Sequence, residues 1–137
     1  MPVHIDIHKA GGIIIQDGKL LVTRSHGKAH FIMPGGKLEN NETAKQALVR
    51  ELREELQLNI SETDLELFGT YRATAADAPD KIVEMTVFIV HDLSEAPVAS
   101  SEIAELAWID SKPTKFEVGS IVLHDVLPSL LQRELIA

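Results

Sequence analysis

The chain has 137 residues, 45% of them hydrophobic, and a formal net charge of −8 at pH 7. This length and composition predict one globular domain spanning residues 1–137. The absence of cysteine excludes disulfides and thiolate chemistry and is compatible with the cytoplasmic location that we expect. The acidic charge argues against binding of a nucleic-acid polymer. No apolar run approaches the ~18 residues that a membrane span needs, and no basic stretch precedes an apolar one at the N-terminus.

Short apolar runs bounded by turn residues predict a series of strands. In chain order, these strands cover residues 10–16, 20–23, 31–33, 65–75, 81–91 and 104–110. Asp17-Gly18 lies between the first two runs and is a strong signal for a hairpin. Residues 25–30 are polar and predict a loop, and residues 76–80 predict the connection between the fourth and fifth strands.

Two segments have helical patterns. In the first, residues 44–56, Thr43 is a good N-cap and Gln46 completes a capping box. The second covers residues 121–135 and contains Pro128, which predicts either a kink or a division of that helix. Mixed strands with two helices predict an α+β fold or an α/β/α sandwich.

The first helix carries three acidic residues on one side. Glu51, Glu54 and Glu55 stand at i, i+3 and i+4, and at ~100° per residue they lie beside the predicted core stripe of the helix. That stripe consists of Leu48, Leu52 and Leu56. Like charges at i and i+4 destabilise a helix by a few tenths of a kcal/mol for each pair. The crowding of acids therefore needs an explanation.

Two explanations remain open on helix chemistry alone. The acids form a solvated surface with ion pairs, such as Arg50 with Glu54, or they bind a hard divalent cation, since Mg²⁺ prefers oxygen ligands. Gly35-Gly36 precede the helix and form either a simple tight turn or a place where a ligand approaches the main chain closely. Together with the acids, they favour a site for phosphate and metal.

The spacing of these residues resembles the signature of the Nudix hydrolases, in particular the MutT-like branch. The signature is Gly, five residues, Glu, seven residues, Arg-Glu, an aliphatic residue, one residue, Glu-Glu, one residue, Gly and an aliphatic residue. The matching positions here are Gly36, Glu42, Arg50, Glu51, Leu52, Glu54, Glu55 and Leu58. Gln57 replaces the final glycine, at a helix end where glycine favours the left-handed conformation.

The resemblance implies a Nudix-type α/β/α sandwich with a mixed β-sheet, and it assigns roles to residues. The metal ligands that it implies are Gly35 through its carbonyl, Glu51, Glu54, Glu55, and one of Glu102 and Glu105. Its implied catalytic residues are Arg50, Glu51 and Glu54; Glu51 is the usual candidate for the base, and Arg50 and Glu42 orient the acids. Its implied substrate-binding residues are Arg24, Gly36 and Lys37, of which the two cations are alternatively ordinary surface charges.

The activity implied by the resemblance is a pyrophosphohydrolase that uses Mg²⁺ or Mn²⁺. Water attacks a phosphoanhydride bond of a nucleoside triphosphate or a related nucleoside diphosphate derivative. The alternatives are an ADP-ribose or nucleotide-sugar pyrophosphatase and a non-catalytic module that senses a nucleotide. The expected partner is a small nucleotide, with no membrane or nucleic-acid polymer, and a homodimer stays open.

Overall fold

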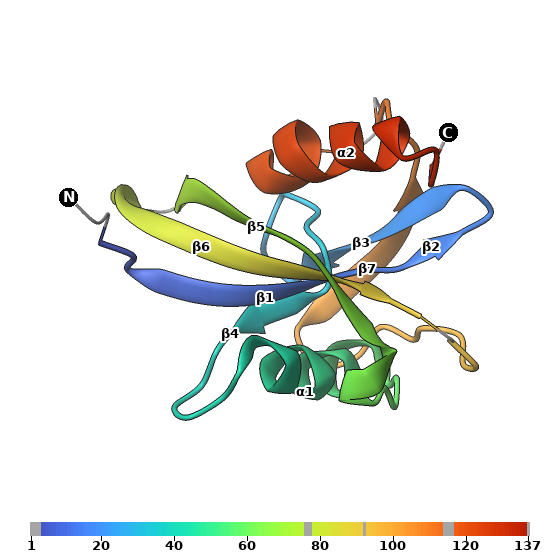
Figure 1. Ribbon diagram of the computed structural model, residues 1–137, viewed down its shortest axis with the longest axis horizontal. Coiled ribbons are helices and arrows are strands. Elements are labelled where there is room, and N and C mark those ends of the chain that lie inside the picture. Colours follow the sequence, from blue (N-terminus) through green and yellow to red (C-terminus); the bar gives the residue numbers. More distant parts are fainter. Residues whose placement is uncertain (1–3, 76–77, 92, 114–116, 137) are drawn as a thin grey trace.

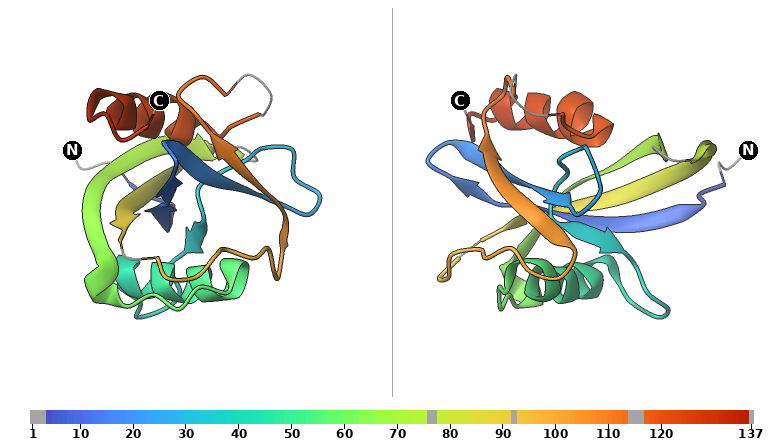
Figure 2. Two further views of the ribbon diagram at one scale, coloured as in Figure 1. Left: turned by 90° about the vertical axis from the view of Figure 1, so that its right-hand side faces the viewer. Right: turned by 180° about the vertical axis from the view of Figure 1, so that it is seen from behind.

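Two β-sheets form the central layer of the molecule, and one helix lies on each side of this layer (Figures 1 and 2). The structure is a computed structural model that describes residues 4–75, 78–91, 93–113 and 117–136. The elements are β1 Ile7–Ile13, β2 Ile15–Gln16, β3 Lys19–Ser25, β4 Gly35–Lys37, α1 Ala44–Leu56, η1 Glu62–Asp64, β5 Leu65–Ala75, β6 Ala78–Val90, β7 Ile103–Ile109, η2 Val122–Val126 and α2 Leu127–Gln132.

The first sheet is mixed and has the strand order β4-β1-β6-β5. Strand β1 runs parallel to β6 and antiparallel to β4, and β5 is antiparallel to β6. The second sheet, β2-β3-β7, is antiparallel. This arrangement confirms the predicted mixed sheet and the α/β/α sandwich.

The predicted hairpin is confirmed at Asp17-Gly18. Ile15 pairs with Leu20 across the turn, and Asp17 and Gly18 both have positive φ, 51° and 73°. Positive φ at both central residues is the requirement of the two-residue turn whose twist matches a hairpin.

Several predicted strand limits are wrong. Residues 31–33 make only isolated bridges, Thr23 with Ile32 and Phe31 with Val118, and the short strand is Gly35–Lys37 instead. The run 10–16 is divided at Ile14, because the chain passes there from one sheet to the other. Of the predicted connection 76–80, residues 76–77 lie outside the described part of the chain.

Three other strands also begin or end at residues that differ from the prediction. Strand β6 begins at Ala78, which pairs with Ala75, and it ends one residue before His91. Strand β7 begins and ends one residue before the predicted 104–110. Strand β3 continues beyond residue 23 to Ser25, since Arg24 and Ser25 still pair with β7.

The C-terminal helical segment changes from the π-type turn η2 to the α-helix α2 between Val126 and Leu127, just before Pro128, and the backbone is helical on both sides of the change. Val122–Val126 form a wider π-type turn, in which the N–H of Leu127 donates to the carbonyl of Val122. Proline has no N–H to continue the regular ladder, and it stands in the first turn of α2, where that absence costs least. The predicted end at residue 135 is wrong, because Glu134 has a φ of 59° and turns the chain so that Ile136 is buried.

The two helices cover separate apolar cores. Helix α1 packs Ala47, Leu48, Leu52 and Leu56 against Ala10, Ile14, Leu21, Leu58, Leu65, Phe88 and Val90. The core beneath η2 and α2 contains Ile13, Leu20, Val22, Phe31, Met33, Phe68, Met85, Val87, Ala107, Ile109 and the helix residues Val122, Val126, Leu127 and Leu130. Within the described ranges, we find no helix with the length and apolar character to cross a membrane.

Helix α1 begins and ends as its sequence predicts. The Thr43 side chain accepts the N–H of Gln46, and the Gln46 side chain accepts the N–H of Thr43. At the other end, Gln57 adopts the left-handed conformation with φ 57° and ψ 33°. Glutamine occupies this region at a cost that glycine does not have.

We predict that Gln57→Gly stabilises the protein by about 1 kcal/mol. The measurement is the free energy of unfolding in urea. Gln132→Gly is the matched control, because Gln132 lies in α2 at an ordinary helical position and its replacement should destabilise by about 1 kcal/mol. A Gln57→Gly variant that is less stable than the parent would show that the side chain of Gln57 contributes more than its backbone strain removes.

Candidate active site

The carboxylate of Glu55 lies inside the buried face of α1. The residue is 4% exposed, whereas the helical geometry predicted a place beside the leucine stripe. The N–H of Gly35 donates to Glu55 Oε1 at 2.9 Å. Burial raises the pKa of Glu55 to about 8, and this one backbone hydrogen bond offsets the burial only in part.

Two further carboxylates converge on Glu55. Oxygen atoms of Glu51, Glu55 and Glu102 all lie within 4.8 Å of one another. Burial raises the pKa of Glu51, although Arg50 opposes that rise. Hydrogen bonding from the Ser101 side chain lowers the pKa of Glu102. The group therefore combines two sheltered acids of α1 with one acid from the loop before β7; we call it the carboxylate cluster.

The backbone beside the cluster has no room for side chains. A Cβ on Gly36 would lie 2.9 Å from Glu51 Cδ and 3.0 Å from both carboxylate oxygens. Gly35 has a φ of 141°, and a Cβ there would lie 2.0 Å from the carbonyl oxygen of Ala10 in β1. The two predicted glycines are thus sterically required, and they bring main-chain groups against the acids.

The donor set fits a hard divalent cation. All three side chains offer oxygen, which hard divalent cations prefer. A cation among them would relieve the mutual repulsion that helps to hold up the pKa of Glu55. Gly35 was predicted to act through its carbonyl, whereas the group that contacts the cluster is its N–H, which donates to Glu55.

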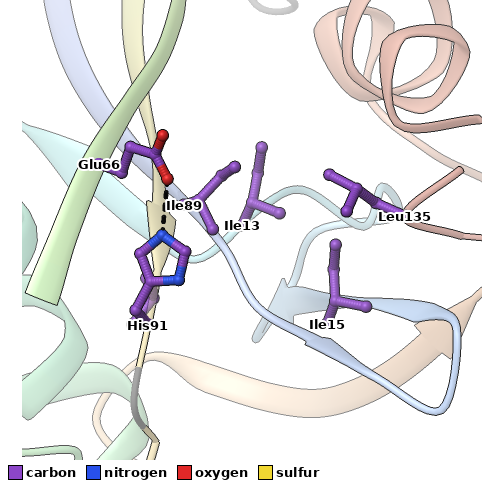
Figure 3. Close-up of a pocket in the computed structure, with 7 residues that line it drawn as sticks. Ile13, Ile15, Glu66, Ile89, His91 and Leu135 are labelled. Carbon is purple, nitrogen blue, oxygen red and sulfur yellow. Dashed lines mark hydrogen bonds and ion pairs between the residues drawn. The ribbon is translucent and has the colours of Figure 1, made fainter. Parts of the chain in front are cut away.

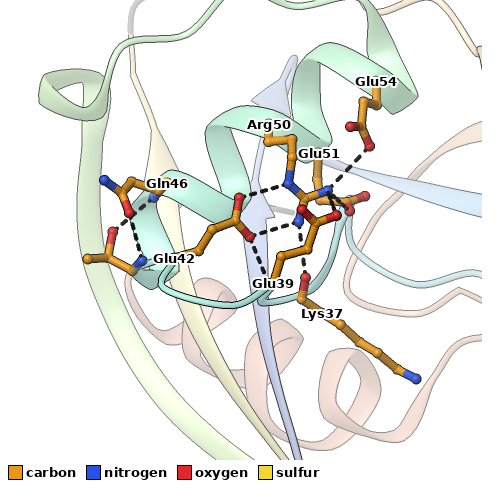
Figure 4. Close-up of polar contacts among 8 residues, drawn as sticks. Lys37, Glu39, Glu42, Gln46, Arg50, Glu51 and Glu54 are labelled. Atoms are coloured by element: carbon orange, nitrogen blue, oxygen red, sulfur yellow. Dashed lines mark hydrogen bonds and ion pairs between the residues drawn. The ribbon is translucent and has the colours of Figure 1, made fainter.

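Glu51, Glu54 and Glu55 form the acid row of α1, and Arg50 binds its outer side (Figure 4). Its Nε and Nη2 donate to the two carboxylate oxygens of Glu42 at 2.8 and 2.9 Å, and its Nη1 donates to Glu51 Oε1 at 2.7 Å. Nη2 also donates to the carbonyl of Lys37 at 3.2 Å. These bonds lower the pKa of Glu42 to about 2 and raise the pKa of Arg50. Arg50 therefore joins α1 to the loop before it and orients Glu51.

Glu54 lies outside the carboxylate cluster. Its side chain is 49% exposed and accepts from Arg50 Nη1 at 3.3 Å. This is the i, i+4 ion pair that the first explanation of the acids predicted. The structure thus brings together Glu51 and Glu55 and leaves Glu54 at the solvent, beside Arg50.

Strand pairing separates the two candidates for the additional ligand. Arg24 and Glu105 face each other across β3 and β7, and Arg24 Nε lies 3.2 Å from Glu105 Oε1. Arg24 Nη1 also donates to the carbonyl of Lys28 at 3.0 Å. Glu105 is therefore paired with Arg24, and Glu102 is the one that reaches the cluster. Lys37 is exposed, and its side chain extends away from Arg50 in Figure 4.

Sequence reasoning missed Glu39 and the serines of the loop before Glu102. Glu39 Oε1 lies 3.6 Å from Arg50, and its N–H donates to Glu42 at 2.8 Å. The spacing of Glu39 and Glu42 across a turn was the available signal. Ser100 carries no such local signal, because the partner of its hydroxyl is the carbonyl of Glu54 on α1.

A separate hollow lies among the end of β1, strand β2, the start of β5, the end of β6 and the segment that follows α2 (Figure 3). It encloses about 430 Å³ and is lined by Ile13, Ile15, Glu66, Ile89, Val90, His91 and Leu135. Its polar groups are His91 and Glu66, which bind each other at 2.7 Å. Among the described residues, no member of the carboxylate cluster lines this hollow.

Comparison with known proteins identifies the family. Residues 6–117 match the NUDIX domain. An 8-oxo-dGTP diphosphatase of Proteus vulgaris is 34% identical over 89 residues, covering 61% of this chain and 75% of the relative. A MutT-like protein of Streptomyces ambofaciens is 31% identical over 129 residues, covering 92% and 79%. The solution structure of the E. coli ORF135 protein aligns with a TM-score of 0.71 and 25% identity, covering 93% of this chain and 89% of that one.

The chain therefore belongs to the NUDIX family. The family predicted from the spacing of the signature residues is confirmed, and so is the predicted class of enzyme, a nucleotide pyrophosphohydrolase.

We predict that Glu55→Gln stabilises the metal-free protein and that the gain grows with pH. The folded protein holds a proton on Glu55 up to about pH 8, whereas an unfolded chain releases it near the ordinary value of 4.5. The stability of the parent therefore falls as pH rises between these values, and the variant lacks this fall. Urea unfolding in EDTA at about pH 5 and about pH 8 should show a gain above about 1 kcal/mol at the higher pH.

Glu62→Gln is the matched control, because it makes the same change of side chain at an exposed position in η1. In a second arm, Mg²⁺ at a hundredfold excess over its Kd should stabilise the parent by about 2.7 kcal/mol and the Glu55 variant much less. Identical pH dependence in the parent and the Glu55 variant would contradict the burial of an ionisable group at this position.

Proposed function

We propose that this Nudix hydrolase uses Glu51, Glu55 and Glu102 to hold Mg²⁺ or Mn²⁺ and hydrolyses a nucleoside triphosphate to the monophosphate and pyrophosphate. The observation that carries the proposal is the convergence of three carboxylates within 4.8 Å beside two glycines. The relative from Proteus vulgaris is an 8-oxo-dGTP diphosphatase, which supports a triphosphate as substrate.

The reaction adds water across a phosphoanhydride bond. A bond forms between the water oxygen and phosphorus, the bridging P–O bond breaks, and a water proton passes to a carboxylate. The bound cation supplies charge neutralisation for the phosphates and lowers the pKa of water. Glu51 is our candidate for the proton acceptor, because Arg50 holds one carboxylate oxygen in place and the residue lies at the cluster.

The charges around the site favour a small anionic substrate that arrives with its cation. The chain carries −8 overall, so it offers no general attraction for a polyanion. Arg50 is bound to Glu42, Glu51 and the Lys37 carbonyl, and Arg24 is bound to Glu105. Charge neutralisation of the phosphates therefore falls to the cation rather than to these two arginines.

We predict turnover in a panel of nucleotides assayed with Mg²⁺ or Mn²⁺, with phosphate and pyrophosphate release measured separately. The panel contains ordinary and oxidised deoxynucleoside triphosphates, ADP-ribose and a nucleotide sugar, together with duplex DNA and RNA. Triphosphate cleavage should release pyrophosphate and leave the polymers intact. Preferred cleavage of ADP-ribose would support the alternative activity, whereas binding of nucleotide without any turnover would indicate a sensing module.

We predict that Glu51→Gln, Glu55→Gln and Glu102→Gln each reduce kcat at saturating Mg²⁺ by at least about a hundredfold. The exposed Glu62→Gln is the control. Glu105→Gln should have a smaller effect, because Glu105 is paired with Arg24. A Glu55 variant with near-normal turnover would refute the assignment, and a Glu54→Gln variant as inactive as Glu55→Gln would show that Glu54 joins the site when the cation binds.

A further inference from the structure

One loop supplies hydrogen-bond donors to the last three carbonyl groups of α1. The N–H of Val98 donates to the carbonyl of Leu56 at 3.0 Å, and the N–H of Ser100 donates to the carbonyl of Glu55 at 2.9 Å. The Ser100 hydroxyl donates to the carbonyl of Glu54 through a short hydrogen bond. Carbonyls at a helix C-terminus have no partner within the helix and must find one elsewhere.

The helix cap itself serves different carbonyls. The N–H groups of Gln57 and Leu58 donate to the carbonyls of Arg53 and Leu52. The loop thus completes the set from Leu52 to Leu56 rather than duplicating a bond. Two of the three bonds from the loop go to the carbonyls of Glu54 and Glu55, so the loop is bound to α1 at the buried acid Glu55.

A tight turn connects this attachment to Glu102. The N–H of Ile103 donates to the carbonyl of Ser100 at 3.1 Å, and Ser101 has a φ of 56°. The N–H of His26 donates to the carbonyl of Glu102 at 2.8 Å. Glu102 therefore lies two residues after Ser100, which is bound to α1, and its own carbonyl is bound by His26. Its carboxylate lies with those of Glu51 and Glu55.

We propose that Ser100 is a positioning residue for the cation site. Its hydroxyl fixes the loop to α1 and thereby holds Glu102 opposite Glu51 and Glu55. The inference rests on the proposed function, since it requires the carboxylate cluster to bind a cation. Without the hydroxyl, the loop keeps its backbone bonds to Glu55 and Leu56 but loses its bond to Glu54. The ligand from the loop would then sample positions away from the two ligands of α1.

These bonds would also form if Ser100 only capped α1. The two roles differ in whether the effect of Ser100 on cation binding depends on the Glu102 carboxylate. If Ser100 acts through Glu102, its removal should weaken cation binding only while Glu102 is a carboxylate. If Ser100 acts through α1, its removal should weaken binding equally with or without the Glu102 carboxylate.

The experiment measures the Kd of Mn²⁺ by electron paramagnetic resonance in the full chain. The variants are Ser100→Ala, Ser100→Gly as a second change without the hydroxyl, Ser100→Thr as the rescue, Glu102→Gln, and Ser100→Ala combined with Glu102→Gln. Ser94→Ala is the control, because Ser94 is exposed in the same loop and makes no side-chain hydrogen bond to the described residues. Metal-free urea unfolding shows that each variant is folded at the assay temperature.

Ser100→Ala and Ser100→Gly should raise the Kd of Mn²⁺ about tenfold, whereas Ser100→Thr and Ser94→Ala should stay near the parent. In the Glu102→Gln background, Ser100→Ala should change the Kd by less than about twofold. A parent-like Kd in Ser100→Ala, or the same tenfold loss in both backgrounds, would overturn the positioning role and leave the proposed function intact. A parent that binds no Mn²⁺, or a Glu102→Gln variant that binds it normally, would instead overturn the cation site as assigned.

Discussion

The burial of the Glu55 carboxylate is the constraint on which the rest of the site depends. A carboxylate within an apolar helix face is costly unless a partner offsets its charge. Within the described chain, the N–H of Gly35 is the hydrogen-bond donor that reaches it, and the raised pKa shows that one such bond is not enough. The helix, strand β4 and the loop before β7 therefore converge on a carboxyl group whose ionised form the protein alone leaves poorly compensated.

The distribution of positive charge is consistent with this constraint. Arg50 lies on the outer side of the acid row, where it binds Glu42 through both carboxylate oxygens and also binds Glu51. No ion pair of the described residues involves Glu55 or Glu102. One side of the row is thus neutralised within the protein, and the other side stays electronegative. This asymmetry orients the site toward an external cation.

The sequence predicts those features that depend on neighbours along the chain. The capping box, the hairpin at Asp17-Gly18 and the helix 44–56 are local, and the structure confirms them. The choice between Glu102 and Glu105 was not predictable, because it follows from the pairing of β3 with β7, which places Arg24 opposite Glu105. The depth of Glu55 likewise depends on how α1 packs against the sheet, and helical spacing alone does not give that orientation.

The two neighbouring glycines of β1 show how separate the two halves of the molecule are. A Cβ on Gly11 would lie 2.9 Å from Met85 Sδ in the core beneath α2, whereas a Cβ on Gly12 would lie 3.3 Å from Leu48 Cδ1 in the core of α1. Among the described residues, no buried side chain belongs to both cores. A substitution within the core beneath α2 therefore replaces no member of the core of α1, the helix that carries Glu51 and Glu55.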